Sequence, residues 1–165
     1  MRLVGGHLAL DFANTIEPSR EHLAAPVDLV AWGRDVGLRG DADASTLTRA
    51  RELRRTVYEV FRPLAERREP DADALAALAA FHADAVAGAR LVPGEGFVWD
   101  GDLLAPIAVA AVDLLRTGPL DRLKVCAGCP WLFLDTSRNR SRRWCSMSDC
   151  GARLKMRRYR ASAAR

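Results

Sequence analysis

The sequence has no apolar run long enough to cross a bilayer. The longest one, at residues 103–111, already contains Pro106, whereas a membrane helix needs roughly 20 consecutive apolar residues. The first residues also lack the long apolar segment and small-residue cleavage site of a signal peptide. We therefore expect a cytoplasmic protein with no membrane partner.

Motifs typical of catalysis are lacking as well. No nucleophile–base pair, phosphate-binding loop or catalytic metal motif can be recognised in the chain. We therefore predict that the protein is not an enzyme. An active site in the N-terminal part is a third hypothesis, behind two binding functions given below, and no motif supports it.

Charge is distributed unevenly, because lysine is absent from residues 1–121 and acidic residues are scarce in residues 122–165. The first segment carries 13 arginines against 19 acidic residues, a net charge of −6. The second carries 12 basic residues against only Asp135 and Asp149, a net charge of +10. This asymmetry predicts two units, of which the second binds a polyanion. The alternative is that the two halves attract each other.

The apolar pattern predicts a mainly helical N-terminal unit over residues 1–121 with one small β element. Residues 8–12 fit either a short strand or the start of a helix. Residues 90–92 and 97–99 flank turn residues and predict a β-hairpin. Leu75 is expected to face the core. Apolar residues at helical spacing predict helices at residues 26–36, 45–68, 71–87 and 102–116.

Cysteine occurs at four positions only: Cys126, Cys129, Cys145 and Cys150. The two closely spaced pairs, 15 residues apart, match the spacing of a tetrahedral zinc site. Gly128 is expected to permit the backbone conformation of a metal-binding turn whose N–H groups point at sulfur. Four thiolates leave no position for water, so we predict one structural Zn²⁺. Disulfides, a redox Cys-x-x-Cys and an iron–sulfur cluster are less favoured alternatives.

The C-terminal unit, residues 122–165, is predicted to be a treble-clef-like zinc finger. Residues 131–134 and 142–144 are expected to form two short strands of a hairpin. Ser146 or Ser148 should then cap a helix that carries Cys150 in its first turn. Since so small a unit buries little core, zinc should hold it folded. We expect Cys126→Ser to release the metal and unfold the finger while sparing the N-terminal helices.

Basic residues crowd the predicted hairpin and helix and favour a surface that binds phosphate groups. The alternative is a solvated, charged tail. Trp131, Phe133 and Trp144 are expected to form the small core of the finger and not to stack on bases. The candidate nucleic-acid-binding residues are Arg138, Arg140, Arg142, Arg143, Arg153, Lys155, Arg157, Arg158 and Arg160.

The stretch from Cys126 to Met147, followed by Cys150-Gly151, resembles the CGNR zinc-finger family. Residues 6–15, Gly-His-Leu-Ala-Leu-Asp-Phe-Ala-Asn-Thr, resemble the opening of the ABATE domain that accompanies that finger. The resemblance implies a bacterial, stress-induced transcription regulator whose finger binds DNA. The chain departs from the family motif at Ala152, where an Asn is expected, while Arg153 is retained. This departure puts the strength or selectivity of DNA binding in question.

Three polar residues near the N-terminus, His7, Asp11 and Asn14, are candidates for lining a small-molecule effector pocket. The alternative is that local caps and backbone groups satisfy them.

The favoured function is a regulator that binds duplex DNA and senses an effector. The second is a zinc-stabilised module that binds RNA or protein. Because one finger covers a small site, we also expect a homodimer.

Overall fold

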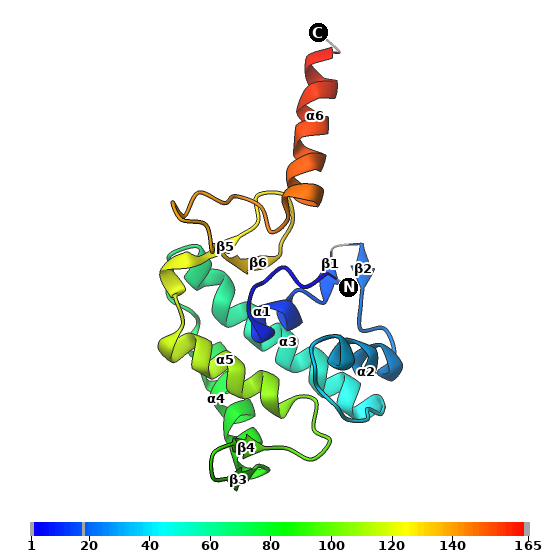
Figure 1. Cartoon of the computed structure of the whole chain (residues 1–165), viewed down its shortest axis with the longest axis vertical. Coiled ribbons are helices and arrows are strands. Elements are labelled where there is room, and N and C mark those ends of the chain that lie inside the picture. The colour runs from blue at the N-terminus through cyan, green and yellow to red at the C-terminus, as the bar shows by residue number, and fades with distance from the viewer. Residues whose placement is uncertain (1, 18, 164–165) are drawn as a thin grey trace.

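The computed structural model describes residues 2–17 and 19–163, apart from the side chains of residues 158, 159, 161 and 163. It is about 53% helical, and α6 projects away from the rest of the molecule (Figure 1). The α-helices are α1 (Leu8–Ala13), α2 (Pro26–Asp35), α3 (Ala44–Ala65), α4 (Ala72–Ala87), α5 (Ala105–Thr117) and α6 (Ala152–Ala163).

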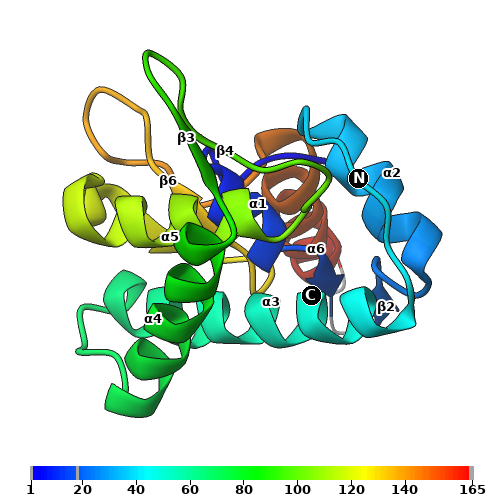
Figure 2. The ribbon, with the colours of Figure 1, turned by 90° about the horizontal axis from the view of Figure 1, so that it is seen from below.

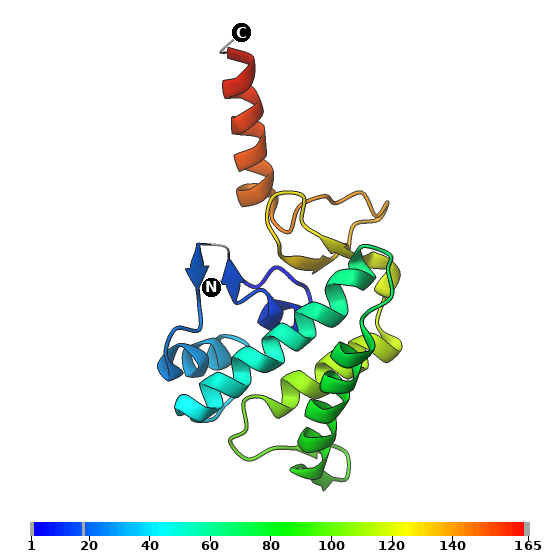
Figure 3. The same cartoon turned by 180° about the vertical axis from the view of Figure 1, so that it is seen from behind.

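The predicted helices are confirmed. Residues 8–12, for which the sequence allows a strand or a helix, lie in helix α1. Asp43 and Asp71 cap α3 and α4 by accepting backbone N–H groups with their carboxylates. α5 begins later than the predicted residue 102, because Asp102 accepts the N–H groups of Leu104 and Ala105 ahead of the helix. α3 crosses the molecule and packs against α1, α2 and α4 (Figures 2 and 3).

The expectation for Leu75 is wrong, because its side chain is 36% exposed. α4 instead buries Ala74, Leu78 and Ala85. Small alanines allow α4 to lie close to α3 and α5, and Leu75 is left exposed.

The strands form antiparallel pairs. β1 (Ile16–Glu17) pairs with β2 (Arg20–Glu21), β3 (Arg90–Val92) with β4 (Gly96–Val98), and β5 (Leu123–Val125) with β6 (Leu132–Leu134). The β3–β4 pair confirms the predicted hairpin, while β1, β2 and β5 were not predicted. A short 3-10 helix, η1 (Leu120–Arg122), leads into β5.

The predicted pairing of residues 131–134 with residues 142–144 is wrong. β6 pairs with β5, in the register Leu123↔Leu134 and Val125↔Leu132, so that residues 126–131 form the connection. Residues 142–144 are not a strand. Their carbonyl groups bind elsewhere: Arg142 O accepts from Lys124 Nζ at 3.1 Å, and Arg143 O accepts from the N–H of Ala127 at 2.9 Å.

The β5–β6 hairpin belongs to two hydrophobic cores. Leu132 and Leu134 face the main core of the helices, which also contains Leu123. Phe133, between them, faces the cysteines, as expected from the alternation of side chains along a strand. The boundary near residue 121 stays a prediction, and the main core extends across it.

No helix in the described part of the chain is long and apolar enough to cross a membrane.

Candidate metal centre and basic surface

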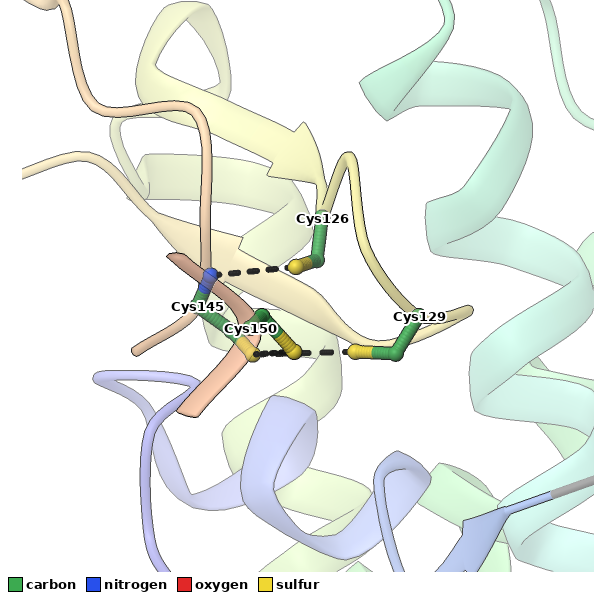
Figure 4. Close-up of side chains that lie close together, drawn as sticks. All are labelled: Cys126, Cys129, Cys145 and Cys150. Atoms are coloured by element: carbon green, nitrogen blue, oxygen red, sulfur yellow. Dashed lines mark hydrogen bonds between the residues drawn. The ribbon is translucent and has the colours of Figure 1, made fainter. Parts of the chain in front are cut away.

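The four cysteines converge on one point although they come from two separate segments (Figure 4). Cys126 and Cys129 lie in the β5–β6 connection, whereas Cys145 and Cys150 flank the start of a helical segment. Their sulfur atoms all lie within 4.8 Å of one another. The Sγ atoms of Cys129 and Cys145 are 3.6 Å apart, and those of Cys145 and Cys150 are 3.8 Å apart.

These distances fit a tetrahedral zinc site. Four ligands with Zn–S bonds of about 2.3 Å place the sulfur atoms about 3.8 Å apart. All four cysteines are free, so the alternative of disulfides is not realised. Four thiolates saturate the coordination of zinc and leave no position for water. The site therefore holds a single structural zinc.

Backbone N–H groups point at the sulfur of Cys126, as predicted for a metal-binding turn. The N–H of Cys145 lies 3.2 Å from this sulfur, and that of Gly128 lies 3.4 Å from it. The neighbouring thiols of Cys129 and Cys145, together with these N–H groups, hold the pKa of Cys126 well below its ordinary value. Without a metal the thiolate is therefore favoured at Cys126 alone, since the contact with Cys126 raises the pKa of the Cys129 and Cys145 thiols.

Gly128 also provides space at the metal site, and its backbone is not left-handed. The φ angle of Gly128 is not positive. A Cβ atom at this position would lie 3.0 Å from Cβ of Cys150. The lack of a side chain thus allows the two ligand pairs to approach each other.

The second ligand pair is positioned by a π-helical turn, η2 (Met147–Gly151), that leads into α6. Ser146 caps this turn, since its hydroxyl accepts the N–H of Asp149 at 3.3 Å. Of the two predicted capping residues, Ser146 is therefore the one used. The cap places Cys150 at the base of α6, so the metal centre anchors the helix to the finger.

Asp135 organises the loop between the ligand pairs, a role that the sequence analysis did not predict. Its carboxylate is fully buried and accepts from Lys124 Nζ at 2.7 Å, and from the N–H groups of Ser137 and Arg142 at 2.9 Å each. Burial by itself would raise the pKa of Asp135, but these hydrogen bonds outweigh it and hold the pKa below its ordinary value. The signal available in the sequence is that Asp135 is one of only two acidic residues in the basic segment.

Arg142, a candidate for nucleic-acid binding, is used inside the finger. Its Nε donates to the carbonyl of Trp144 at 2.8 Å, and its Nη2 donates to the carbonyl of Cys145. The guanidinium also lies 4.8 Å from the ring centre of Phe133. Arg142 therefore supports the backbone at a metal ligand, and this internal role is one that the sequence did not predict.

The remaining candidate nucleic-acid-binding residues differ in whether their side chains make contacts within the protein. Arg140 forms an ion pair with Asp121, and Arg153 donates to Sγ of Cys150 at 3.2 Å. The side chain of Arg158 lies outside the described residues. The other candidates are exposed to solvent: Arg138, Arg143, Lys155, Arg157 and Arg160.

A groove of about 900 Å³ lies between α6, the metal centre and the β1–β2 pair. We call it the basic groove. Arg2 and Arg20, which the sequence analysis missed, contribute to it from the N-terminal unit, although Arg2 is paired with Asp149. The exposed Ala152 also lines it. The cations of the basic groove are Arg2, Arg20, Arg153, Arg157 and Arg160.

Comparison with known protein families covers nearly the whole chain. Residues 6–118 match the ABATE model, described as "Putative stress-induced transcription regulator". Residues 122–163 match the CGNR zinc finger. The chain belongs to the ABATE family. A search of curated proteins gave no match.

Three polar residues at the start of the ABATE region bind groups of the chain itself. Nδ1 of His7 accepts the N–H of Ala9 at 3.3 Å, and Asp11 accepts the N–H of Gly5 at 2.7 Å. Asn14 binds the backbone of the CGNR finger, as described below. Burial lowers the pKa of His7 and raises that of Asp11. Their observed contacts are structural, and an effector-binding role for them stays a prediction.

Proposed function

We propose that this ABATE-family protein is a transcription regulator that binds duplex DNA through its CGNR finger. The supporting observation is α6, which extends away from the body and ends far from the helices of the ABATE region (Figure 1). Its sequence contains no acidic residue, and Lys155, Arg157 and Arg160 are exposed along it. A helix of this composition attracts phosphate groups and releases their counterions on binding.

The dimensions of α6 suit the major groove. A helix of 12 residues is about 18 Å long, and the major groove of B-DNA, about 12 Å wide, admits one α-helix. Arg153, Arg157 and Arg160 follow one another at steps of four and three residues and so share a face. The metal centre fixes the base of this helix, which allows its cations to act as a preorganised surface.

The proposal is tested by measuring the affinity for duplex DNA as a function of salt concentration. Each phosphate contact contributes about 0.9 to the slope of log K against log salt. The double variant Arg157→Ala with Arg160→Ala should reduce the slope by about 2 while retaining zinc. The matched control, Arg34→Ala with Arg39→Ala, removes two exposed arginines of the ABATE region and should leave the slope unchanged.

Two results would contradict the proposal. An unchanged slope in the α6 variant would show that this helix does not contact phosphates. Tighter binding to RNA than to duplex DNA at the same salt concentration would favour the second candidate, an RNA-binding module.

We further propose that two chains bind one operator, because a single finger contacts only a few base pairs. Sedimentation of the protein–DNA complex should then give two chains per duplex. One chain per duplex at saturation would contradict this.

A further inference from the structure

A second cavity lies where the ABATE region meets the finger, and Trp131 forms part of its wall. Its volume is about 470 Å³, within the range of pockets that hold small molecules. We call it the junction pocket. Its lining surface is mostly apolar, and Ala13, Ile16, Tyr58, Pro130 and Trp131 are among the residues that form it.

Hydrogen bonds between the two regions hold the walls of the junction pocket in place. The hydroxyl of Tyr58 on α3 donates to the carbonyl of Pro130 at 3.0 Å and accepts from Arg62 at 2.6 Å. The indole N–H of Trp131 donates to the carbonyl of Ile16 at 3.0 Å. The pocket is therefore formed before a ligand arrives, which lowers the entropic cost of binding.

The charged groups around the pocket favour an anion. Arg51, Arg54 and Arg55 border it from one face of α3, against a single acidic residue, Glu17. Arg54 is neutralised by Glu21, its two guanidinium nitrogens lying 2.6 Å from the two carboxylate oxygens.

Neither of the other two arginines forms a close ion pair within the described residues, although the charge of Arg51 lies near enough to help lower the pKa of Glu21. Arg51 binds the neutral carbonyl groups of Leu23 and Ala24. Arg55 is 70% exposed, and its ion pair with Glu59 is long, at 3.9 Å. An exposed pair of this length is weak, so Arg55 can exchange Glu59 for an acidic group of a ligand.

We propose that the junction pocket binds a small organic monoanion, with an apolar or aromatic body between Ile16, Tyr58 and Trp131 and its acidic group at Arg55. Ile16 is 43% exposed, and such a ligand would cover it. The same ligand would contact Trp131, two residues after the zinc ligand Cys129. It would thus bridge the ABATE region and the finger, which goes beyond the DNA-binding function proposed above.

The test uses the full, zinc-loaded chain without DNA, so its outcome does not depend on DNA binding. The anionic probe is 8-anilinonaphthalene-1-sulfonate, and the neutral probe of similar shape is N-phenyl-1-naphthylamine. Both fluoresce in apolar surroundings. Each is titrated into the wild-type protein and the variants, and the fold of every variant is verified by its circular dichroism and zinc content.

Ile16→Trp fills the pocket and should lower the affinity for both probes at least about tenfold. Val27→Trp places the same side chain at an exposed position of α2 and should change neither affinity. Arg55→Leu should weaken the anionic probe about two- to fivefold, as for an exposed ion pair, and leave the neutral probe unaffected. Arg34→Leu, an exposed arginine on α2, is its control.

A competing site for the anionic probe is the basic groove, so Arg157→Ala with Arg160→Ala is measured as well. The proposal expects one probe molecule per chain and full retention of its affinity in this variant. Unchanged binding in Ile16→Trp, loss of binding in the basic-groove variant alone, or no saturable binding of either probe to the wild type would overturn it.

Discussion

The side-chain amide of Asn14 makes hydrogen bonds with both backbone groups of Leu132. Its Nδ2 donates to the carbonyl of Leu132 at 2.9 Å, and its Oδ1 accepts the N–H of Leu132 at 2.9 Å. The amide thus replaces a neighbouring strand at the edge of β6. Both residues are buried, with 1% exposure for Asn14 and none for Leu132, so water cannot substitute for either bond.

We predict that Asn14→Leu lowers the free energy of unfolding by about 3 kcal/mol, because it leaves two buried backbone groups of Leu132 without partners. The measurement is urea denaturation of the zinc-loaded protein. Asn139→Leu removes an exposed asparagine of the finger loop and is the control. Equal stabilities of the two variants would contradict a role for Asn14 in joining the ABATE region to the finger.

The sequence predicts the helices and the metal ligands well, because both depend on local patterns. Apolar spacing places α2, α3 and α4 to within a few residues, and the spacing of the cysteines alone defines the zinc ligands. Leu75 is an exception, since its burial depends on how closely the alanines of α4 approach other helices. That distance is a property of packing and not of periodicity.

Long-range pairings are the part that the sequence does not predict. Strand β5 contains only Leu123, Lys124 and Val125, which is too short a run to predict a strand or its pairing with β6. The polar residues at the N-terminus allow either a ligand pocket or local hydrogen bonds, whereas Asn14 binds a strand 118 residues away. Likewise, Arg142 and Arg143 are adjacent residues of the same type, and they differ only in the groups that surround their side chains in the folded protein.

Removal of zinc should destabilise the ABATE helices as well as the finger. The sequence alone predicts that Cys126→Ser spares these helices. However, Leu123, Leu132 and Leu134 belong to the main core and are held in place by the hairpin whose connection carries two zinc ligands. We therefore expect Cys126→Ser to reduce zinc from one ion per chain to nearly none and to accelerate amide hydrogen exchange in α3.

Elemental analysis and hydrogen exchange measure these two effects. The control is wild-type protein from which zinc is removed by a chelator and then restored, which should return α3 to slow exchange. One zinc retained per chain in the variant would contradict the ligand assignment. Zinc loss with unchanged exchange in α3 would show that the two regions fold independently.

The ion pair between Glu21 and the buried Arg54 predicts a dependence of stability on pH. Arg54 is 6% exposed and also donates to the carbonyl of Thr15. Burial by itself raises the pKa of Glu21, but the hydrogen bonds from Arg54 and from the N–H of Leu23 outweigh it, so this pKa lies below its ordinary value of 4.5. A lowered pKa in the folded state stabilises the protein above pH 4.5, and this contribution is lost as the pH falls through the folded value.

Glu21→Gln should therefore cost about 2 kcal/mol of stability at pH 7, a value reduced because Glu21 is partly exposed. The difference from the wild type should shrink as the pH falls below 4.5. Thermal unfolding measured across this range is the experiment, and the exposed Glu59→Gln is the control. A difference that is independent of pH would contradict the role of this carboxylate.

Arg142 and Arg143 should have separable functions although they are adjacent. The guanidinium of Arg142 binds the carbonyl groups of Trp144 and Cys145, so Arg142→Ala should destabilise the finger by about 2 kcal/mol and speed the transfer of zinc to a chelator. Arg143 is exposed and lies 5.6 Å from the ring centre of Trp144. Arg143→Ala should keep its zinc. It should reduce the slope of log K for DNA binding against log salt concentration by about 1.

Both variants are measured for zinc transfer rate and for DNA affinity at several salt concentrations, which separates a loss of structure from a loss of a phosphate contact. If Arg142→Ala released zinc at the wild-type rate while its salt slope fell, Arg142 would contact phosphate directly and its internal hydrogen bonds would be dispensable. If Arg143→Ala lost zinc, the exposed arginine would support the finger. Only opposite behaviour of the two variants agrees with the contacts observed, since one guanidinium is occupied by backbone carbonyl groups and the other faces solvent.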